Sequence, residues 1–194
     1  MTPKQSDLML TIYKKQQTVF SLKELTLLFP NIAYQNLKRR INYFVKVGKL
    51  KRPRRGLYAK ENYSSWELAN KIYTPSYISL ETVLAQDGVI FQAYKSIFLV
   101  SYLSRRLSVD NNDYYYRKIN ESILYNKDGI NLIDNCYVAT KERAFLDAVF
   151  LYRDYHFDNL SSINWELVDD LVKIYKSKTL DKRIKEYKKY VGQE

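Results

Sequence analysis

The sequence predicts an α+β protein that is mostly helical, with an N-terminal winged helix-turn-helix followed by a C-terminal α+β domain that contains a small antiparallel sheet. Three observations lead to this prediction. The net positive charge is confined to the first third of the 194 residues. Helical patterns in that third end in a hairpin-like segment, and aromatic, β-branched runs lie among helical segments in the remainder. The step in charge sets the predicted domains at 1–63 and 64–194.

The basic charge is one-sided along the chain. Residues 1–63 contain 14 Lys and Arg against 3 Asp and Glu, whereas residues 64–194 contain 18 basic and 18 acidic residues. No acidic residue occurs from position 25 to position 60. Such a field attracts a polyanion and releases its counterions, which favours nucleic acid as the partner. A solubilising basic face and an anionic membrane surface are the alternatives.

The first elements are two short helices. Apolar residues at helical spacing predict a helix over about 4–16, followed by a short β-favouring stretch. Ser21 and Glu24 have the spacing of a capping box, which starts the second helix. Pro30 disfavours helical geometry at the residue before it and so ends that helix. Asn31 is expected to cap the third helix.

The third helix, predicted over about 32–48, has one apolar and one polar face. The apolar face is expected to pack against the first two helices, which together make a helix-turn-helix. On the polar face, Arg can bind guanine and Gln or Asn can bind adenine in the major groove. The predicted DNA-reading residues are Gln35, Lys38, Arg39, Asn42 and Lys46.

A basic hairpin is predicted directly after this helix. Leu50 with Leu57 or Tyr58 supplies its inward side chains, and Pro53 and Gly56 suit its loop. A hairpin at this place is a wing, whose cations reach phosphates or the minor groove. The predicted contacts are Lys51, Arg52, Arg54 and Arg55 in the hairpin, and Lys49, which flanks the polar face of the third helix, is a further DNA-binding candidate. A solvated loop, a cleavage-like sequence and a protein-docking winged helix are the alternatives.

The neutral part of the chain mixes helices and strands. Trp66, Leu68 and Ala69 predict a short helix that is closed by Thr74 and Pro75. Ser79 is expected to cap a helix that ends at Gly88, where glycine adopts the left-handed conformation, and Thr140 is expected to cap a later helix. Strands are predicted at 97–103, 114–119, 122–125 and 136–139, and further helices at 164–177 and 179–191.

Two motifs in the neutral part carry a family resemblance. The first is YISLETVL at 77–84 and the second is ATKERAFLD at 139–147. In this order after a winged helix, they resemble the AbiEi family of antitoxins from abortive-infection toxin–antitoxin systems. Val83 stands where that family usually has Ala, Lys141 where Pro is frequent, and Phe145 in place of Leu. The family-motif positions, structural or antitoxic in role, are Ser79, Leu80, Glu81, Thr140, Glu142 and Asp147.

The resemblance implies a DNA-binding autorepressor that is also an antitoxin. AbiEi-like proteins bind inverted repeats upstream of their own operon through the winged helix. Their C-terminal domain counters a nucleotidyltransferase-like toxin, and a stable complex with the toxin is not required. The alternative is a solitary winged-helix transcription factor whose second domain senses a ligand or dimerises.

The sequence predicts no enzyme, and neither a cofactor nor a metal is expected. No glycine-rich loop suits a phosphate, and the single His156 and Cys136 are a poor basis for a metal site. Glu142 and Asp147 point roughly 140° apart on a helix, and Arg143 with Asp147 is expected to form an ion pair on its surface. A metal-dependent nuclease is the remaining enzymatic alternative. The lone cysteine and the lack of a signal peptide or membrane span favour the cytoplasm.

Overall fold

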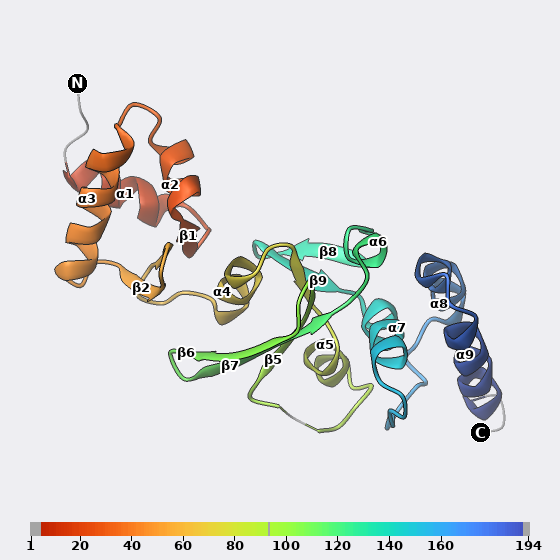
Figure 1. The fold of residues 1–194 in the computed structure, drawn as a ribbon. Helices are drawn as coiled ribbons and strands as arrows, with labels where there is room; N and C mark the ends of the chain where they lie inside the picture. The colour runs from red at the N-terminus through yellow and green to blue at the C-terminus, as the bar shows by residue number, and fades with distance from the viewer. Residues whose placement is uncertain (1–4, 93, 192–194) are drawn as a thin grey trace. The chain divides into compact units, whose positions relative to one another are not determined.

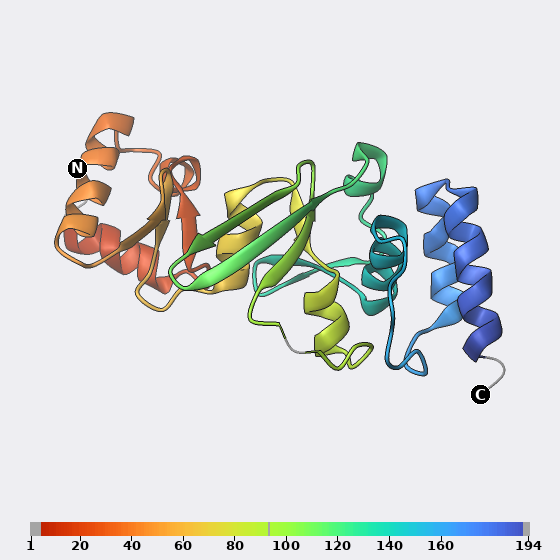
Figure 2. The same ribbon diagram turned by 60° about the horizontal axis from the view of Figure 1, so that its bottom comes forward.

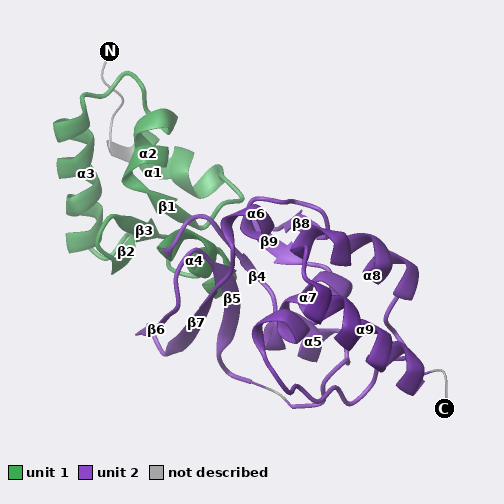
Figure 3. Ribbon diagram, turned by 45° about the vertical axis from the view of Figure 1, so that its right-hand side comes forward, with its two compact units in different colours: residues 1–72 green, residues 73–194 purple. Residues whose placement is uncertain are grey.

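The chain folds into two compact units, residues 1–72 and residues 73–194. Figure 3 shows these units in different colours. The structure is a computed structural model and describes residues 5–92 and 94–191. Each unit has its own sheet.

The first unit combines short helices with a three-stranded antiparallel sheet (Figure 1). Its strands lie in the order β1-β3-β2. A helix, a strand, two further helices and a terminal hairpin make the winged helix-turn-helix arrangement. In chain order the elements are α1 (Gln5–Lys14), β1 (Val19–Ser21), α2 (Leu22–Leu28), α3 (Tyr34–Lys46), β2 (Lys51–Arg54), β3 (Leu57–Ala59) and α4 (Ser65–Ile72).

The helix α2 begins and ends as its local sequence predicts. The Ser21 hydroxyl accepts a hydrogen bond from the Glu24 N–H at 3.2 Å, and the Glu24 carboxylate accepts one from the Ser21 N–H at 2.7 Å. This reciprocal pair confirms the capping box. The helix ends at Leu28, and Phe29 is its C-cap. The residue before Pro30 therefore leaves the helix, as the steric conflict with the proline ring requires.

The start of α3 differs from the prediction. Ala33, not Asn31, is its N-cap, and no side chain caps it. The Ile32 N–H donates to the Phe29 carbonyl, and the Ile32 side chain is buried in the core of the unit. Burying Ile32 stabilises the fold by about 1.5–3 kcal/mol, more than the roughly 1 kcal/mol of a typical cap. The turn that buries Ile32 therefore delays the helix past Asn31.

A buried carboxylate attaches α4 to the first unit. Glu67 is 1% exposed. It accepts hydrogen bonds from the Thr18 N–H at 2.8 Å, the Thr18 hydroxyl at 2.6 Å and the Val19 N–H at 3.2 Å. These bonds hold α4 against the start of β1, so the first unit extends beyond residue 63, where the charge step lies.

The second unit is built on a six-stranded mixed sheet with strand order β6-β7-β5-β4-β9-β8. The pairs β4–β9 and β5–β7 are parallel and the others antiparallel. The helix α7 lies between the sheet and the α8–α9 pair (Figure 1 and Figure 2). In chain order the elements are β4 (Ser76–Ile78), α5 (Glu81–Gln86), β5 (Ile97–Ser101), β6 (Arg105–Val109), β7 (Asn112–Lys118), α6 (Glu121–Leu124), β8 (Ile130–Ile133), β9 (Cys136–Ala139), α7 (Lys141–Leu151), α8 (Trp165–Leu171), the 3₁₀ helix η1 (Val172–Tyr175) and α9 (Lys178–Val191).

The predicted fold class is wrong in its balance of helix and sheet. Of the residues that the structure describes, 45% are helical and 21% are in strands, and the sheet of the second unit is six-stranded and mixed rather than small and antiparallel. Residues 122–124, predicted as part of a strand, lie in α6. The prediction also misses β4, which has only three residues, all of them buried, and it misses β6 and β8. The side chains of β6 and β8 are mostly exposed or half-buried, so these two strands lack the alternation that identifies a strand in sequence.

Two hairpin turns carry the signal for the missed strands. Asp110 and Asn111 have φ values of 47° and 64°, and Asp134 and Asn135 have values of 47° and 63°. Two successive left-handed residues make a type I′ turn, which favours Asn and Asp and matches the twist of a hairpin. The Asp-Asn pair therefore marks both the β6–β7 and the β8–β9 hairpin.

Candidate nucleic-acid interface

The polar face of α3 is held at the surface by the apolar face of the same helix. Leu37, Ile41 and Phe44 are at most 1% exposed and belong to the core of the first unit. The five residues predicted to read DNA are exposed on the opposite side: Gln35, Lys38, Arg39, Asn42 and Lys46. Because the core fixes the rotation of the helix about its axis, these side chains are presented together to solvent.

Two hydrogen bonds restrain this polar face. The Arg39 guanidinium donates to Asn36 Oδ1 at 3.1 Å, one turn earlier on the helix. The hydroxyl of Tyr58, which is buried in β3, donates to Asn42 Oδ1 at 3.3 Å. Asn42 Oδ1 keeps a second lone pair and its amide N–H groups, so this bond orients the side chain and leaves it able to pair with adenine. The hydrogen bond of Arg39 likewise leaves other guanidinium N–H groups to donate to a base.

The predicted hairpin is formed by β2 and β3. The register of β2, which contains Pro53, is irregular, as expected where a proline removes a backbone donor. Gly56 has a φ of 84°, a left-handed conformation that glycine adopts without strain, and Arg55 beside it is exposed. The Arg52 guanidinium lies 5.9 Å from the centroid of the Tyr58 ring. The hairpin thus carries exposed cations, and the buried Tyr58 holds it in place.

Two lysines of the basic segment have partners within the protein. Lys51 forms an exposed ion pair with Glu61 at 3.7 Å. Lys60 donates to the carbonyl oxygens of Tyr13 and Lys15 near the end of α1, where a cation offsets the negative end of the helix dipole. Lys60 therefore supports the fold. Of the remaining hairpin residues, Lys49, Arg52 and Arg55 are exposed and Arg54 is half-buried.

The charge of Glu24, at the start of α2, is balanced by a neighbouring lysine. Glu24 forms an ion pair with Lys71 and accepts from the Ser21 N–H. Burial alone would raise the pKa of Glu24, but the hydrogen bonds from Lys71 and Ser21 hold the pKa below its ordinary value of 4.5. Glu24 is thus ionised at neutral pH, and its charge is compensated by Lys71.

In the second unit, the two family motifs meet at one carboxylate. Asp147 is fully buried, and its Oδ2 accepts a hydrogen bond from the Ser79 hydroxyl at 2.8 Å. Its Oδ1 accepts from the hydroxyls of Tyr77 at 3.2 Å and Tyr175 at 2.6 Å. Burial and the Asp147 carboxylate raise the pKa values of Tyr77 and Tyr175 well above their ordinary range. Both hydroxyls therefore stay protonated and donate to Asp147.

Arg143 completes this buried network, and the prediction of a surface ion pair is wrong. Its guanidinium is 0% exposed, and Nε lies 3.5 Å from Asp147 Oδ1. Nη1 donates to the Asp128 carbonyl at 2.9 Å, and Nη2 donates to the Ile123 carbonyl at 2.8 Å. Residues 142–149 of α7 are all buried, because α7 packs on both sides. The i, i+4 spacing of Arg143 and Asp147, which on a solvent-exposed helix forms a surface ion pair, therefore forms a buried ion pair in α7.

Ser79 and Thr140 were both predicted as helix caps, and only Thr140 is one. The Thr140 hydroxyl accepts from the Arg143 N–H at 3.2 Å and caps α7. The N-cap of α5 is Leu80, which has a φ of 56°. Ser79 lies one residue before this N-cap, and its hydroxyl donates to Asp147.

The two motif glutamates each hold a neighbouring segment. Glu142 is 4% exposed, and its Oε1 accepts from the N–H of Asn164, the N-cap of α8, at 3.2 Å. Glu81 accepts from the Tyr152 hydroxyl at 3.2 Å, and burial raises its pKa. These contacts give the family-motif residues a structural role in the second unit.

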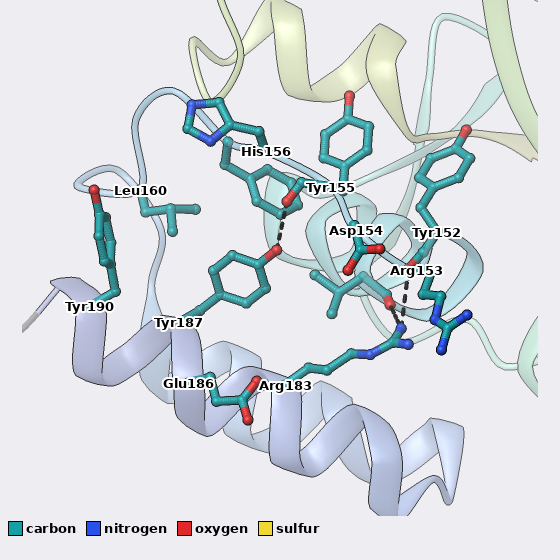
Figure 4. A pocket seen from close by; sticks show the side chains of 12 residues that line it. Tyr152, Arg153, Asp154, Tyr155, His156, Leu160, Arg183, Glu186, Tyr187 and Tyr190 are labelled. Carbon is teal, nitrogen blue, oxygen red and sulfur yellow. Dashed lines mark hydrogen bonds between the residues drawn. The ribbon is translucent and has the colours of Figure 1, made fainter.

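An aromatic pocket of about 690 Å³ lies between the segment after α7 and the helix α9 (Figure 4). The Arg183 guanidinium donates to the carbonyl oxygens of Val149 at 2.8 Å and Tyr152 at 3.1 Å, at the end of α7. The Tyr187 hydroxyl donates to the Tyr155 carbonyl at 2.6 Å. These bonds connect α9 to the preceding segment, so the Arg183 and Tyr187 side chains support the fold.

The single histidine and the single cysteine of the sequence differ in exposure. The His156 side chain is 88% exposed and lies 3.8 Å from the Asp158 carboxylate, while Cys136 is buried. Within residues 5–92 and 94–191, no three His, Cys, Asp or Glu side chains cluster as metal ligands. Over the same ranges, no helix combines the length and apolar character needed to cross a bilayer.

A scan against protein-family models finds no match to this chain, and a search of curated proteins finds none either.

Proposed function

We propose that this protein is a DNA-binding autorepressor and the antitoxin of a toxin–antitoxin operon. The observation that carries the DNA-binding part is the exposed polar face of α3, held in place by a buried apolar face and followed by a basic hairpin. Guanidinium and amide groups suit base edges, and the hairpin cations suit phosphates. The proposed partner is double-stranded operator DNA with inverted repeats upstream of its own operon, and the compartment is the cytoplasm.

Binding to the upstream region tests the role of α3. Arg39→Ala is expected to reduce discrimination between the operator and a scrambled duplex by about tenfold, because a good bidentate base contact contributes about 1–3 kcal/mol. Lys14→Ala removes one exposed charge from α1 and is the matched control, with discrimination unchanged. Wild-type discrimination in Arg39→Ala would show that α3 does not read the operator through this residue.

The antitoxin part rests on the resemblance of the two motifs and on their meeting in one buried network. We propose that the second unit counters a nucleotidyltransferase-like toxin and that α3 and the hairpin are not needed for this. Co-expression of the full chain with the toxin encoded next to it should restore growth. The variant Arg54→Ala with Arg55→Ala should restore growth equally while losing repression. Toxicity that persists beside folded wild-type chain would contradict the proposal.

A solitary transcription factor with a ligand-sensing second unit is the second candidate function. The observation in its favour is a cavity of about 610 Å³ on the sheet of the second unit. The neighbouring gene separates the two candidates: a nucleotidyltransferase-like reading frame supports the antitoxin, and its absence supports the solitary regulator.

A further inference from the structure

The two edges of the sheet in the second unit carry different side chains. The sheet ends at β6 on one side and at β8 on the other (Figure 1). Two consecutive arginines, Arg105 and Arg106, lie exposed on the β6 edge. The strand β8, Ile130–Ile133, contains no charged residue and no proline. Charged residues and proline keep an exposed sheet edge from pairing with another chain, so β6 has this protection and β8 lacks it.

Both edges of the sheet in the first unit are blocked as well. The β2 edge contains Pro53 among three cations. At the β1 edge, the Val19 N–H donates to Glu67 at 3.2 Å, and the Ser21 N–H donates to Glu24 at 2.7 Å. Carboxylates therefore occupy the backbone donors that another strand would need. Of the four sheet edges in the described part of the chain, β8 alone has neither kind of protection.

The backbone groups of Leu132 point away from β9 toward this open edge. Ile133 and Cys136 flank the two-residue type I′ turn of the β8–β9 hairpin, so they exchange hydrogen bonds. The next pair, Leu132 with Tyr137, exchanges none, because the two kinds of pair alternate along an antiparallel ladder. Among the residues that the structure describes, none bonds the Leu132 N–H or C=O.

Exposed apolar side chains accompany these free backbone groups. Leu132 is 64% exposed, Ile133 is 50% exposed and Tyr137 is 47% exposed. Leu132 and Tyr137 are paired across the two strands, so their side chains lie next to each other on the same face of the sheet. Adjacent apolar side chains beside unpaired backbone groups form the kind of surface that another chain covers.

We propose that β8 pairs with the β8 strand of a second copy of this chain, antiparallel and around a two-fold axis at Leu132. Leu132 then lies opposite the Leu132 of the second copy, and each donates its N–H to the C=O of the other. The two Tyr137 rings flank the two leucines, so the contact buries an apolar cluster built from both copies. Because β8 carries no charge, the pairing avoids the repulsion that two copies would meet at β6.

The symmetry of the proposed operator favours a second copy as the occupant of this edge. Inverted repeats present two half-sites related by a two-fold axis, which a two-fold pair of repressors matches. A strand of four residues falls short of the roughly 1,200 Å² that a stable interface buries. The pair is therefore weak in solution and strengthened when both copies bind one operator. In this respect the choice of occupant rests on the proposed function.

Disulfide cross-linking without DNA tests the pairing independently of operator binding. In a Cys136→Ala background, Leu132→Cys should form a linked dimer on mild oxidation, because directly opposed residues of such a pair have Cα atoms about 5.5 Å apart, within reach of a disulfide. Tyr190→Cys in the same background is the matched control, since Tyr190 is 63% exposed and Leu132 is 64% exposed. The Leu132→Cys dimer should form at least about tenfold faster than the control dimer.

Sedimentation over a range of concentrations gives a second measurement. The average mass of the wild type should rise above that of one chain as its concentration increases. Leu132→Lys opposes two like charges and removes the apolar contact, so it should weaken self-association at least about fivefold. Leu27→Lys adds the same charge at a leucine of α2 that is 72% exposed and should leave self-association unchanged. Melting temperatures check that both variants are folded.

Two results would overturn the pairing: a Leu132→Cys dimer that forms no faster than the Tyr190→Cys dimer, or equal self-association in both lysine variants. A wild-type chain that stays monomeric, while folded Leu132→Lys no longer restores growth beside the toxin, would also overturn it and assign the edge to the toxin. A chain that pairs through Leu132 without binding the operator would keep this inference and contradict the proposed function.

Discussion

The two units use arginine in opposite ways. Arg39 and Arg55 of the first unit are exposed on a helix face and a hairpin, whereas Arg143 of the second unit is fully buried against Asp147. An exposed ion pair contributes about 0–1 kcal/mol, and breaking a buried one costs about 3–5 kcal/mol. Exposed arginines are therefore available to a polyanion, and the buried one holds the fold. The count of charges along the chain does not separate these roles, because burial decides between them.

The largest expected effect is in the buried network. Asp147→Ala leaves the Arg143 charge and three hydroxyls without their acceptor and should lower the free energy of unfolding of the second unit by about 3–5 kcal/mol. Trp66→Phe leaves Trp165 as the fluorescence reporter of this unit in urea unfolding. Asp170→Ala, which breaks an exposed pair with Lys173, is the control and should cost under about 0.5 kcal/mol. Similar losses in both variants would contradict the difference between exposed and buried charge.

Removing a buried charge from the first unit should lower its stability, as in the buried network of the second unit. Glu67→Gln replaces a carboxylate that accepts three hydrogen bonds and should lower the free energy of unfolding of the first unit by about 1–3 kcal/mol. Trp165→Phe leaves Trp66 of α4 as its reporter. Glu61→Gln removes the exposed partner of Lys51 and should change stability by less than about 0.5 kcal/mol. An unchanged stability in Glu67→Gln would show that α4 is not attached through this carboxylate.

The two arginines at the end of the hairpin should act mainly on DNA binding. Arg54→Ala with Arg55→Ala should weaken binding to every duplex and reduce the slope of log affinity against log salt by about 2, or roughly 0.9 per phosphate contact. Lys182→Ala with Lys185→Ala removes two exposed charges from α9 and should leave the slope unchanged. Equal slopes in all three proteins would exclude the hairpin from the phosphate contact.

Local signals were sufficient where a few neighbouring residues decide the structure. They predicted the capping box of Ser21 and Glu24, the polar face of α3 and the hairpin after it. They failed where distant segments decide: the turn that buries Ile32, the strands with exposed side chains, and the burial of Arg143 from both sides of α7. The open edge of β8 was not predicted either, since only the order of the strands in the sheet shows which of them lie at an edge.

The smallest expected effect is a pH dependence in the first unit, at a charge that is neither fully exposed nor fully buried. Although burial would raise it, the pKa of Glu24 is held below 4.5 by Lys71 and Ser21. The ionised form therefore stabilises the folded state at pH values above about 4.5, and this contribution is lost as the pH falls through the lower pKa of the folded state. Because the Glu24 side chain is 38% exposed, solvent screening limits the effect to under about 1 kcal/mol. Thermal unfolding between pH 7 and pH 3 should show a smaller loss of stability in Glu24→Gln than in the wild type. A wild-type curve that parallels that of Glu24→Gln would mean that the capping box acts through hydrogen bonding alone, without a contribution from charge.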